Sequence, residues 1–254
     1  VTLTGGTSTV NGDVINNGTL TTAHTPVTFT GDFVNNGTFK NTETTVTFVG
    51  SYQENGVFIS DPATTYLQDI TVGEMGALIG GEVNGEYDRW YIANDFINNS
   101  LRNTLWNTID AFLGFTGELD GFQDVFLAGA DMGDDLAGFM NNFAWGYVDI
   151  ASPSTLSLFD GNMENDGTAL YAEVLTGIRL DQGQVINITG DMNIYYLSDL
   201  AENDYLAGLS YGFASGSGML IPIAGTPTQT PVPGSLLLMI SGVLGIAWVR
   251  RKVL

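Results

Sequence analysis

Two short segments of the chain concentrate oxygen-bearing side chains that could bind a metal ion. The candidate ligands are Asp131, Asp134 and Asp135 in GADMGDDLAG, and Asp160, Asn162 and Asp166, with Glu164 between the last two, in DGNMENDG. Hard oxygen ligands at nearly alternate positions suit Ca²⁺, which takes roughly six to eight of them. Neither segment completes an EF-hand, because Asn165 stands where that loop needs Gly and Tyr171 where it needs Glu. Calcium is therefore the one cofactor we consider, and ordinary Asp-rich turns between strands are the alternative.

The residues needed for catalysis are sparse. His24 is the single histidine, and its TAHTP surroundings lack the Ser and Asp partners of a triad. Arg89, Arg102 and Arg179 are scattered, and no Gly-rich loop leads into a Lys as in a P-loop. The sequence predicts a protein that is not an enzyme.

A nineteen-residue repeat indicates the elements that position these side chains. NGDVINNGTL (residues 11–20), TGDFVNNGTF (residues 30–39) and VGSYQENGVF (residues 49–58) align without gaps. Self-similarity at a fixed period is typical of a solenoid, in which one coil cannot bury its apolar face alone. The period-two alternation in VTFTG and VTFVG favours strands over helices. We therefore expect an all-β parallel β-helix (β-solenoid), with coils of about 19 residues in the N-terminal part.

Equivalent asparagines recur in these repeats. Asn17, Asn36 and Asn55 each precede a glycine, and Asn-Gly pairs suit tight turns because both residues tolerate positive φ. Equivalent residues in stacked coils lie about 4.8 Å apart, close enough for side-chain amides to bond between coils. We predict a ladder of these three residues.

Local pattern leaves residues 101–145 ambiguous. Leu101, Leu105 and Ile109 have helical spacing, whereas Leu113 and Phe115 alternate as in a strand. Residues 154–223 are clearer, because Gly, Asn and Asp punctuate short apolar runs about every ten residues, a spacing typical of an all-β chain.

Several segments of this later part resemble a known group of proteins. They are NDFINNSLRNTLWNT (residues 94–108), FLAGADMG (126–133), NNFAWG (141–146), ALYAEVL (169–175) and MNIYY (192–196). In this order they resemble the body of extracellular PEP-CTERM proteins with autotransporter-like β-helical repeats, over most of residues 94–223. The resemblance implies strands and turns in the ambiguous middle and an extracellular location. It implies no enzymatic activity.

The C-terminal residues are organised differently from the predicted solenoid body, residues 1–223. A Pro/Thr linker (residues 224–233) precedes an apolar segment (residues 234–254) that ends in basic residues. This order resembles the PEP-CTERM sorting signal recognised by exosortase-type transpeptidases, with Val in place of the Glu that gives the signal its name. The residues concerned are Pro231, Val232, Pro233, Arg250, Arg251 and Lys252. The resemblance implies a transient membrane anchor and a sortase-type partner; an ordinary anchor or a packed apolar strand is the alternative.

The amino-acid composition excludes some classes of binding partner and of site. The 254 residues include 28 acids and 7 bases, a formal net charge of −21, so nucleic acid should be repelled. Cysteine is absent, which excludes disulfides and thiolate sites.

We therefore expect an exported structural protein of the cell surface or extracellular matrix. Self-association head-to-tail into fibres is a further expectation, because no polar cap precedes the first repeat. The alternatives are an adhesin, or a β-helix that binds or degrades extracellular polysaccharide. Trp90, Tyr91, Trp106 and Trp145 could stack on sugars in that case, or could equally belong to the core.

Overall fold

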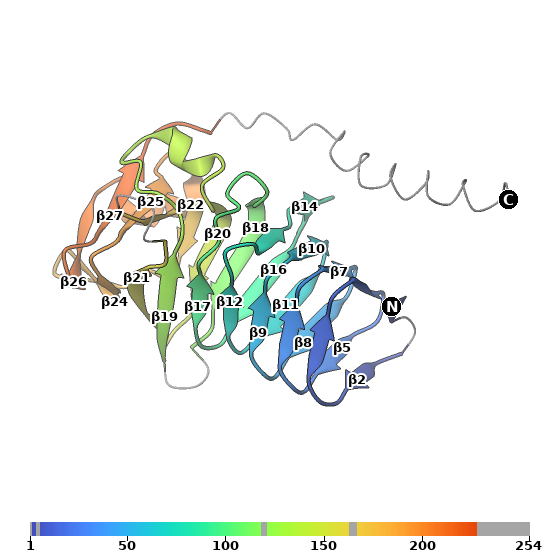
Figure 1. Ribbon diagram of the computed structural model, residues 1–254. Coiled ribbons are helices and arrows are strands. Elements are labelled where there is room, and N and C mark those ends of the chain that lie inside the picture. Colours follow the sequence, from blue (N-terminus) through green and yellow to red (C-terminus); the bar gives the residue numbers. More distant parts are fainter. Residues whose placement is uncertain (1, 4–5, 118–120, 163–166, 228–254) are drawn as a thin grey trace, which may run out of the picture.

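The computed structural model describes residues 2–3, 6–117, 121–162 and 167–227. These residues form an elongated stack of coils built almost wholly from parallel strands (Figure 1). The predicted all-β solenoid is confirmed. Three parallel ladders of strands run along the stack, and we call them sheets 1, 2 and 3.

The strands of each sheet follow one another from coil to coil. Sheet 1 contains β2 (Ser8–Val10), β5 (Val27–Phe29), β8 (Thr45–Phe48), β11 (Thr64–Leu67), β16 (Arg89–Ile92), β18 (Thr108–Phe115), β20 (Trp145–Ile150), β22 (Ala169–Thr176), β25 (Asn193–Leu197) and β27 (Met219–Ile223). Sheet 2 contains β3 (Val14–Asn16), β6 (Phe33–Asn35), β9 (Tyr52–Glu54), β12 (Ile70–Val72), β17 (Phe96–Asn98), β19 (Phe122–Leu127), β21 (Thr155–Asp160), β24 (Gln184–Gly190) and β26 (Tyr211–Ser215). Sheet 3 contains β1 (Thr2–Leu3), β4 (Thr19–Ala23), β7 (Thr38–Thr42), β10 (Val57–Asp61) and β13 (Ala77–Ile79).

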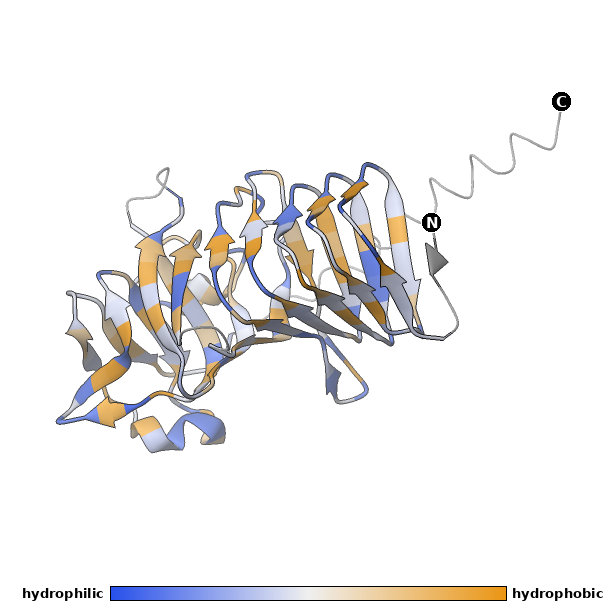
Figure 2. Ribbon diagram, turned by 90° about the horizontal axis from the view of Figure 1, so that it is seen from below, coloured by the Kyte–Doolittle hydropathy of each residue, from blue (hydrophilic) through white to orange (hydrophobic). Residues whose placement is uncertain are grey.

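The register of the first coils reproduces the sequence repeat. Val14 pairs with Phe33, and Phe33 with Tyr52, so equivalent residues of successive repeats stack directly. Alternate residues point inward, and Figure 2 shows the resulting mixture of hydrophobic and hydrophilic positions along the strands. The predicted coil of about 19 residues is confirmed for this part of the chain.

Stacked aromatic rings fill the interior of these coils. Phe29 lies 5.1 Å from Phe48 and Phe33 lies 5.4 Å from Tyr52, both measured between ring centroids, and all four are at most 2% exposed. Burying a side chain of this size contributes roughly 1.5–3 kcal/mol. The stack continues through Trp90 to a core shared by the later coils.

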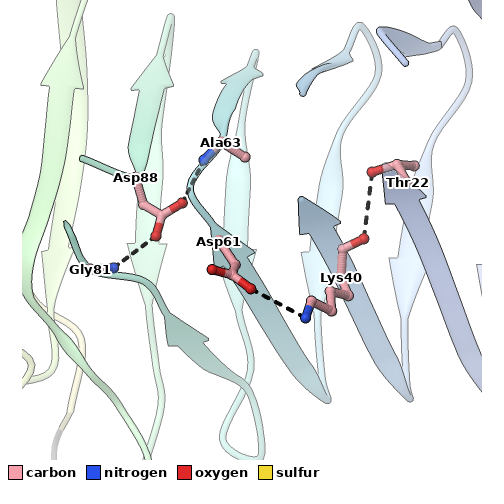
Figure 3. Close-up of polar contacts among 6 residues, drawn as sticks. All are labelled: Thr22, Lys40, Asp61, Ala63, Gly81 and Asp88. Atoms are coloured by element: carbon pink, nitrogen blue, oxygen red, sulfur yellow. Dashed lines mark hydrogen bonds and ion pairs between the residues drawn. The ribbon is translucent and has the colours of Figure 1, made fainter. Parts of the chain in front are cut away.

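The coils lengthen after β13, where sheet 3 ends among the described residues. A hairpin of β14 (Glu82–Val83) and β15 (Glu86–Tyr87) is inserted, so Thr64 pairs with Arg89 rather than with a residue nineteen positions on. Asp88 ties the base of this hairpin to the preceding coil by accepting hydrogen bonds from the backbone N–H groups of Ala63 and Gly81, both 2.8 Å (Figure 3). Buried Asp88 thus fixes where the insertion leaves the stack.

Residues 101–145 contain strands and turns, with β18 beginning at Thr108 and β19 at Phe122. The strands and turns expected for this stretch are present, because a turn and the start of a strand lie between Leu101 and Ile109, where the apolar spacing alone also matched a helix. The two short 3₁₀ helices are η1 (Leu136–Phe139) and η2 (Ala201–Leu206). No helix within the described ranges is long and apolar enough to cross a membrane.

A second apolar cluster lies on the outer side of sheet 1 in the later coils. Tyr171 and Tyr195 belong to it, whereas their strand neighbours Ala172 and Tyr196 point into the main core. Phe139 of η1 packs on Tyr171 with ring centroids 5.4 Å apart, and Tyr205 of η2 donates a hydrogen bond to the carbonyl oxygen of Leu175. The outer side of sheet 1 is therefore covered at β22 and β25.

Candidate functional site

The asparagines that recur in the repeats form a hydrogen-bonded ladder on the surface. The Nδ2 of Asn36 donates to the Oδ1 of Asn17 (2.9 Å), and the Nδ2 of Asn55 donates to the Oδ1 of Asn36 (3.0 Å). Each bond joins neighbouring coils, so the ladder fixes their register along the axis.

Replacing Asn36 with Ala is expected to lower the free energy of unfolding by about 1–3 kcal/mol, because two bonds of roughly 0.5–1.5 kcal/mol each are lost. Asn17→Ala removes one bond and is expected to cost about half as much. Urea denaturation measures both changes. An Asn36→Ala loss no larger than that of Asn17→Ala would contradict the ladder's role.

A second polar column lies inside the coils and ends in a carboxyl group. Asn16 donates to Asn35, and Asn35 donates to both carboxyl oxygens of Glu54 at 2.9 Å. Glu54 also accepts from the hydroxyl of Tyr52 and the backbone N–H of Gly56, both at 2.7 Å. Burial raises the pKa of Glu54 to about 7 in spite of these donors, which favour the charged form. Burial, and then Glu54 itself, raise the pKa of Tyr52 well above its ordinary range.

Three of the acidic residues considered for calcium, Asp131, Asp135 and Asp160, accept hydrogen bonds from neighbouring groups of the protein. Asp131 accepts from the hydroxyl of Tyr195 (2.7 Å) and the amide of Asn193 (2.9 Å), which holds its loop against sheet 1. Asp135 caps η1 by accepting from the N–H of Ala137, and Asp134 is exposed.

In the second acidic segment, Asp160 accepts a hydrogen bond from the N–H of Asn162, two residues on. Asp166 lies outside the described residues. Across the described ranges no three His, Asp or Glu residues are grouped to hold a metal ion, and calcium binding stays a prediction.

The structure separates the four aromatic residues considered for sugar stacking. Trp90, Trp106 and Trp145 are at most 5% exposed and belong to the core. Tyr91 points outward, because it alternates with the buried Trp90 and Ile92. His24 lies on the surface 3.0 Å from Glu43, between Nδ1 and Oε2. The sorting residues 231–233 and 250–252 lie outside the described residues.

An uncovered part of sheet 1 carries a row of outward-facing aromatic side chains. We define the aromatic row as Tyr66, Tyr91, Phe112 and Tyr147, from β11, β16, β18 and β20, together with Tyr87 of the hairpin. Neighbouring ring centroids lie between 5.1 and 6.5 Å apart. Tyr66 and Tyr91 occupy paired positions and are stacked at 5.2 Å with 15° between ring planes. Tyr66 is 44% exposed, so one end of the row is open to solvent.

A glycine and an arginine contact the rings of the aromatic row and influence how they pack. Tyr91 pairs with Gly114 of the next coil, where a Cβ would lie 2.7 Å from the Tyr91 ring and 3.0 Å from the Phe112 ring. Because Gly114 has no side chain, the rings of Tyr91 and Phe112 can occupy the space beside it. The guanidinium of Arg89 lies 5.8 Å from the centroid of Phe112, within reach of a cation–π contact.

Two hollows lie at opposite ends of the strands that carry Tyr66 and Tyr91. The larger hollow, about 560 Å³, is lined by Glu43, Thr64, Glu86, Tyr87 and Arg89 among others, beside the β14–β15 hairpin. The smaller hollow, about 170 Å³, is lined by Val49, Gln68 and Thr116 as well as by the rings of Tyr66 and Tyr91. On β8 the lining of the larger hollow ends at Thr45 and that of the smaller hollow begins at Thr47, about 7 Å further along at roughly 3.3 Å per residue.

The aromatic row is difficult to predict from the sequence. The inserted hairpin sets Tyr66 and Tyr91 in adjacent coils without the spacing of the repeat, and alternation alone does not tell the outer face from the core. The clearest signal was the alternation of Tyr91 between Trp90 and Ile92.

Comparisons with models of known protein families, with curated proteins and with solved structures find no match for this chain. Its function is therefore inferred from its own residues.

Proposed function

We propose that the protein is an exported structural component of the cell surface or extracellular matrix, sorted through its C-terminal segment by a sortase-type transpeptidase. The observation that carries this proposal is the pairing of strands from coil to coil along sheets 1 and 2, with a side-chain ladder outside and aromatic rings inside the first coils. We infer that such a stack serves as an elongated spacer, because each coil contacts its neighbours through the paired strands.

The sequence beyond the body supports export. The Pro/Thr linker (residues 224–233) separates the coils from the apolar segment (residues 234–254), which ends in basic residues. Cations that flank an apolar stretch favour the cytoplasmic side of a membrane, which would leave the acidic body outside.

The C-terminal residue of the protein isolated from its native cells tests this sorting step. We expect intact-mass measurement to find a chain ending near Pro233, after cleavage by the transpeptidase. In a chain with Arg250, Arg251 and Lys252 replaced by Gln, the basic end is lost and we expect Leu254 to be retained. A native protein that ends at Leu254 would contradict sortase processing.

Head-to-tail assembly into fibres is part of this proposal, and such a heterologous contact would join the two ends of the described body, which differ. At the N-terminal end, β2 and β3 each pair with one strand, and their outer edges have no described partner. At the other end β26 and β27 pair antiparallel with each other. The N–H of Ser198 donates to the carbonyl oxygen of Ile223, so the adjacent Pro222 turns its ring nitrogen to the outer edge, where it offers no donor to a further coil.

A further inference from the structure

We propose that Tyr66 and Tyr91 of the aromatic row, with the two flanking hollows, form a binding site for a neutral polysaccharide that lies along the coils, parallel to β8, β11 and β16. This inference goes beyond the structural role proposed above and does not depend on how the protein is exported. It assigns the site to Tyr66, Tyr91 and Arg89.

The groups that meet here are those that recognise sugars. The ring of Tyr66, which is 44% exposed and is supported from behind by the stacked ring of Tyr91, offers apolar surface for the C–H face of a pyranose. Hydroxyl, carboxylate, amide and guanidinium groups surround the rings: Thr64, Glu43, Glu86, Gln68 and Arg89 line the hollows on either side. Such groups hydrogen-bond to sugar hydroxyls and fix the orientation of a chain that the rings hold.

The position of the hollows gives the direction of the ligand. Both hollows border β8, β11 and β16, one at each end of these strands. A chain that occupied both would pass over Tyr66 and Tyr91. A chain of several sugars reaches both hollows, whereas a single monosaccharide would fill one.

Charge favours a neutral chain. The larger hollow contains the carboxylates of Glu43 and Glu86 against the one guanidinium of Arg89, and Arg89 also faces the ring of Phe112. The whole chain carries a formal net charge of −21. The carboxylates of the larger hollow and the net negative charge of the chain would both repel an anionic polymer.

Neighbouring parts of sheet 1 lack these features. In earlier coils the position of Tyr66 is occupied by Thr28 and Thr47, which carry no ring. In later coils the second apolar cluster, with η1 over Tyr171, covers the outer side. The site is therefore confined to the middle of the stack, beside the inserted hairpin.

Native electrophoresis of the full-length chain in gels that contain a polysaccharide tests the site. We expect hydroxyethyl cellulose, galactomannan or dextran to retard the protein, and polygalacturonate not to do so. Retardation by polygalacturonate alone, or by none of the four, would overturn the proposal.

One substitution and a matched control locate the binding. Tyr66→Thr introduces the residue that Thr47 already supplies one coil earlier, so the coil is expected to keep its structure while binding weakens about tenfold. Phe159→Thr is the control, because Phe159 is 40% exposed and stacks on Phe126 at 4.9 Å, on sheet 2 away from the hollows. Phe159→Thr should bind as the unmodified chain does. Equal affinity of the Tyr66→Thr and unmodified chains, or equal losses in both variants, would refute the assignment.

Discussion

Replacing Gly37 with Ala is expected to lower the free energy of unfolding by about 3 kcal/mol, whereas the same change at Gly18 should alter it by less than about 0.5 kcal/mol. A Cβ on Gly37 would lie 2.1 Å from the carbonyl oxygen of Gly18 in the coil below. The backbone of Gly18 cannot move aside as a flexible side chain would. The two coils must therefore separate, which weakens the hydrogen bonds between them. Gly18 has nothing within 4 Å of its added Cβ, because no described coil lies below it.

Urea denaturation of the two variants and of the unmodified protein measures this difference. The two glycines occupy the same position of the nineteen-residue repeat, so local backbone preference is matched and coil stacking alone separates them. Similar stabilities for Gly37→Ala and Gly18→Ala would mean that the coils do not approach as closely as described.

Replacing Glu54 with Gln is expected to stabilise the protein at pH 8 by about 2–3 kcal/mol and to change little at pH 4. Burial raises the pKa of Glu54 from about 4.5 to about 7, so the folded protein binds this proton more tightly than the unfolded chain. The contribution of this group to stability is therefore fully present below pH 4.5, is lost as the pH rises toward 7, and stays lost above it. Gln carries no charge, and its amide oxygen can still accept from Asn35 and Gly56.

The measurement is the free energy of unfolding between pH 4 and pH 8 for the unmodified and Glu54→Gln chains. We expect the difference between them to grow over this range. In both chains the free energy of unfolding should still decline somewhat over this range because of Glu173. The pKa of Glu173 is raised to about 7 by burial and then by nearby Asp110. A constant difference across the range would contradict a buried, titrating Glu54.

The repeated part of the fold could be predicted because sequence and coil share one period. Every nineteenth residue meets its equivalent, so Asn17, Asn36 and Asn55 come into line without knowledge of the rest of the chain. The nineteen-residue period no longer predicts which residues stack where the hairpin and the longer loops change the length of a coil. At Leu101 and Leu105 the apolar spacing matches a helix, yet the stacking of β18 on β16 decides the conformation that follows.

The candidate site was harder to predict than the coils. Aromatic residues in an apolar sequence can face either side of a strand, and Trp90 and Tyr91 are neighbours that point in opposite directions. Acidic turns are equally ambiguous, because one aspartate can satisfy local backbone N–H groups or bind an ion. Asp131 and Asp135 make contacts within and beyond their own loop that sequence spacing does not reveal.

Export is the central claim, and labelling of intact native cells with a membrane-impermeant, amine-reactive reagent tests it most directly. Lys40 is the one lysine before the C-terminal segment, and its side chain is 39% exposed beside Asp61. We predict that peptide mass spectrometry finds the label on Lys40 without lysis of the cells. Labelling of Lys40 only after lysis would place the solenoid inside the cell and contradict the account.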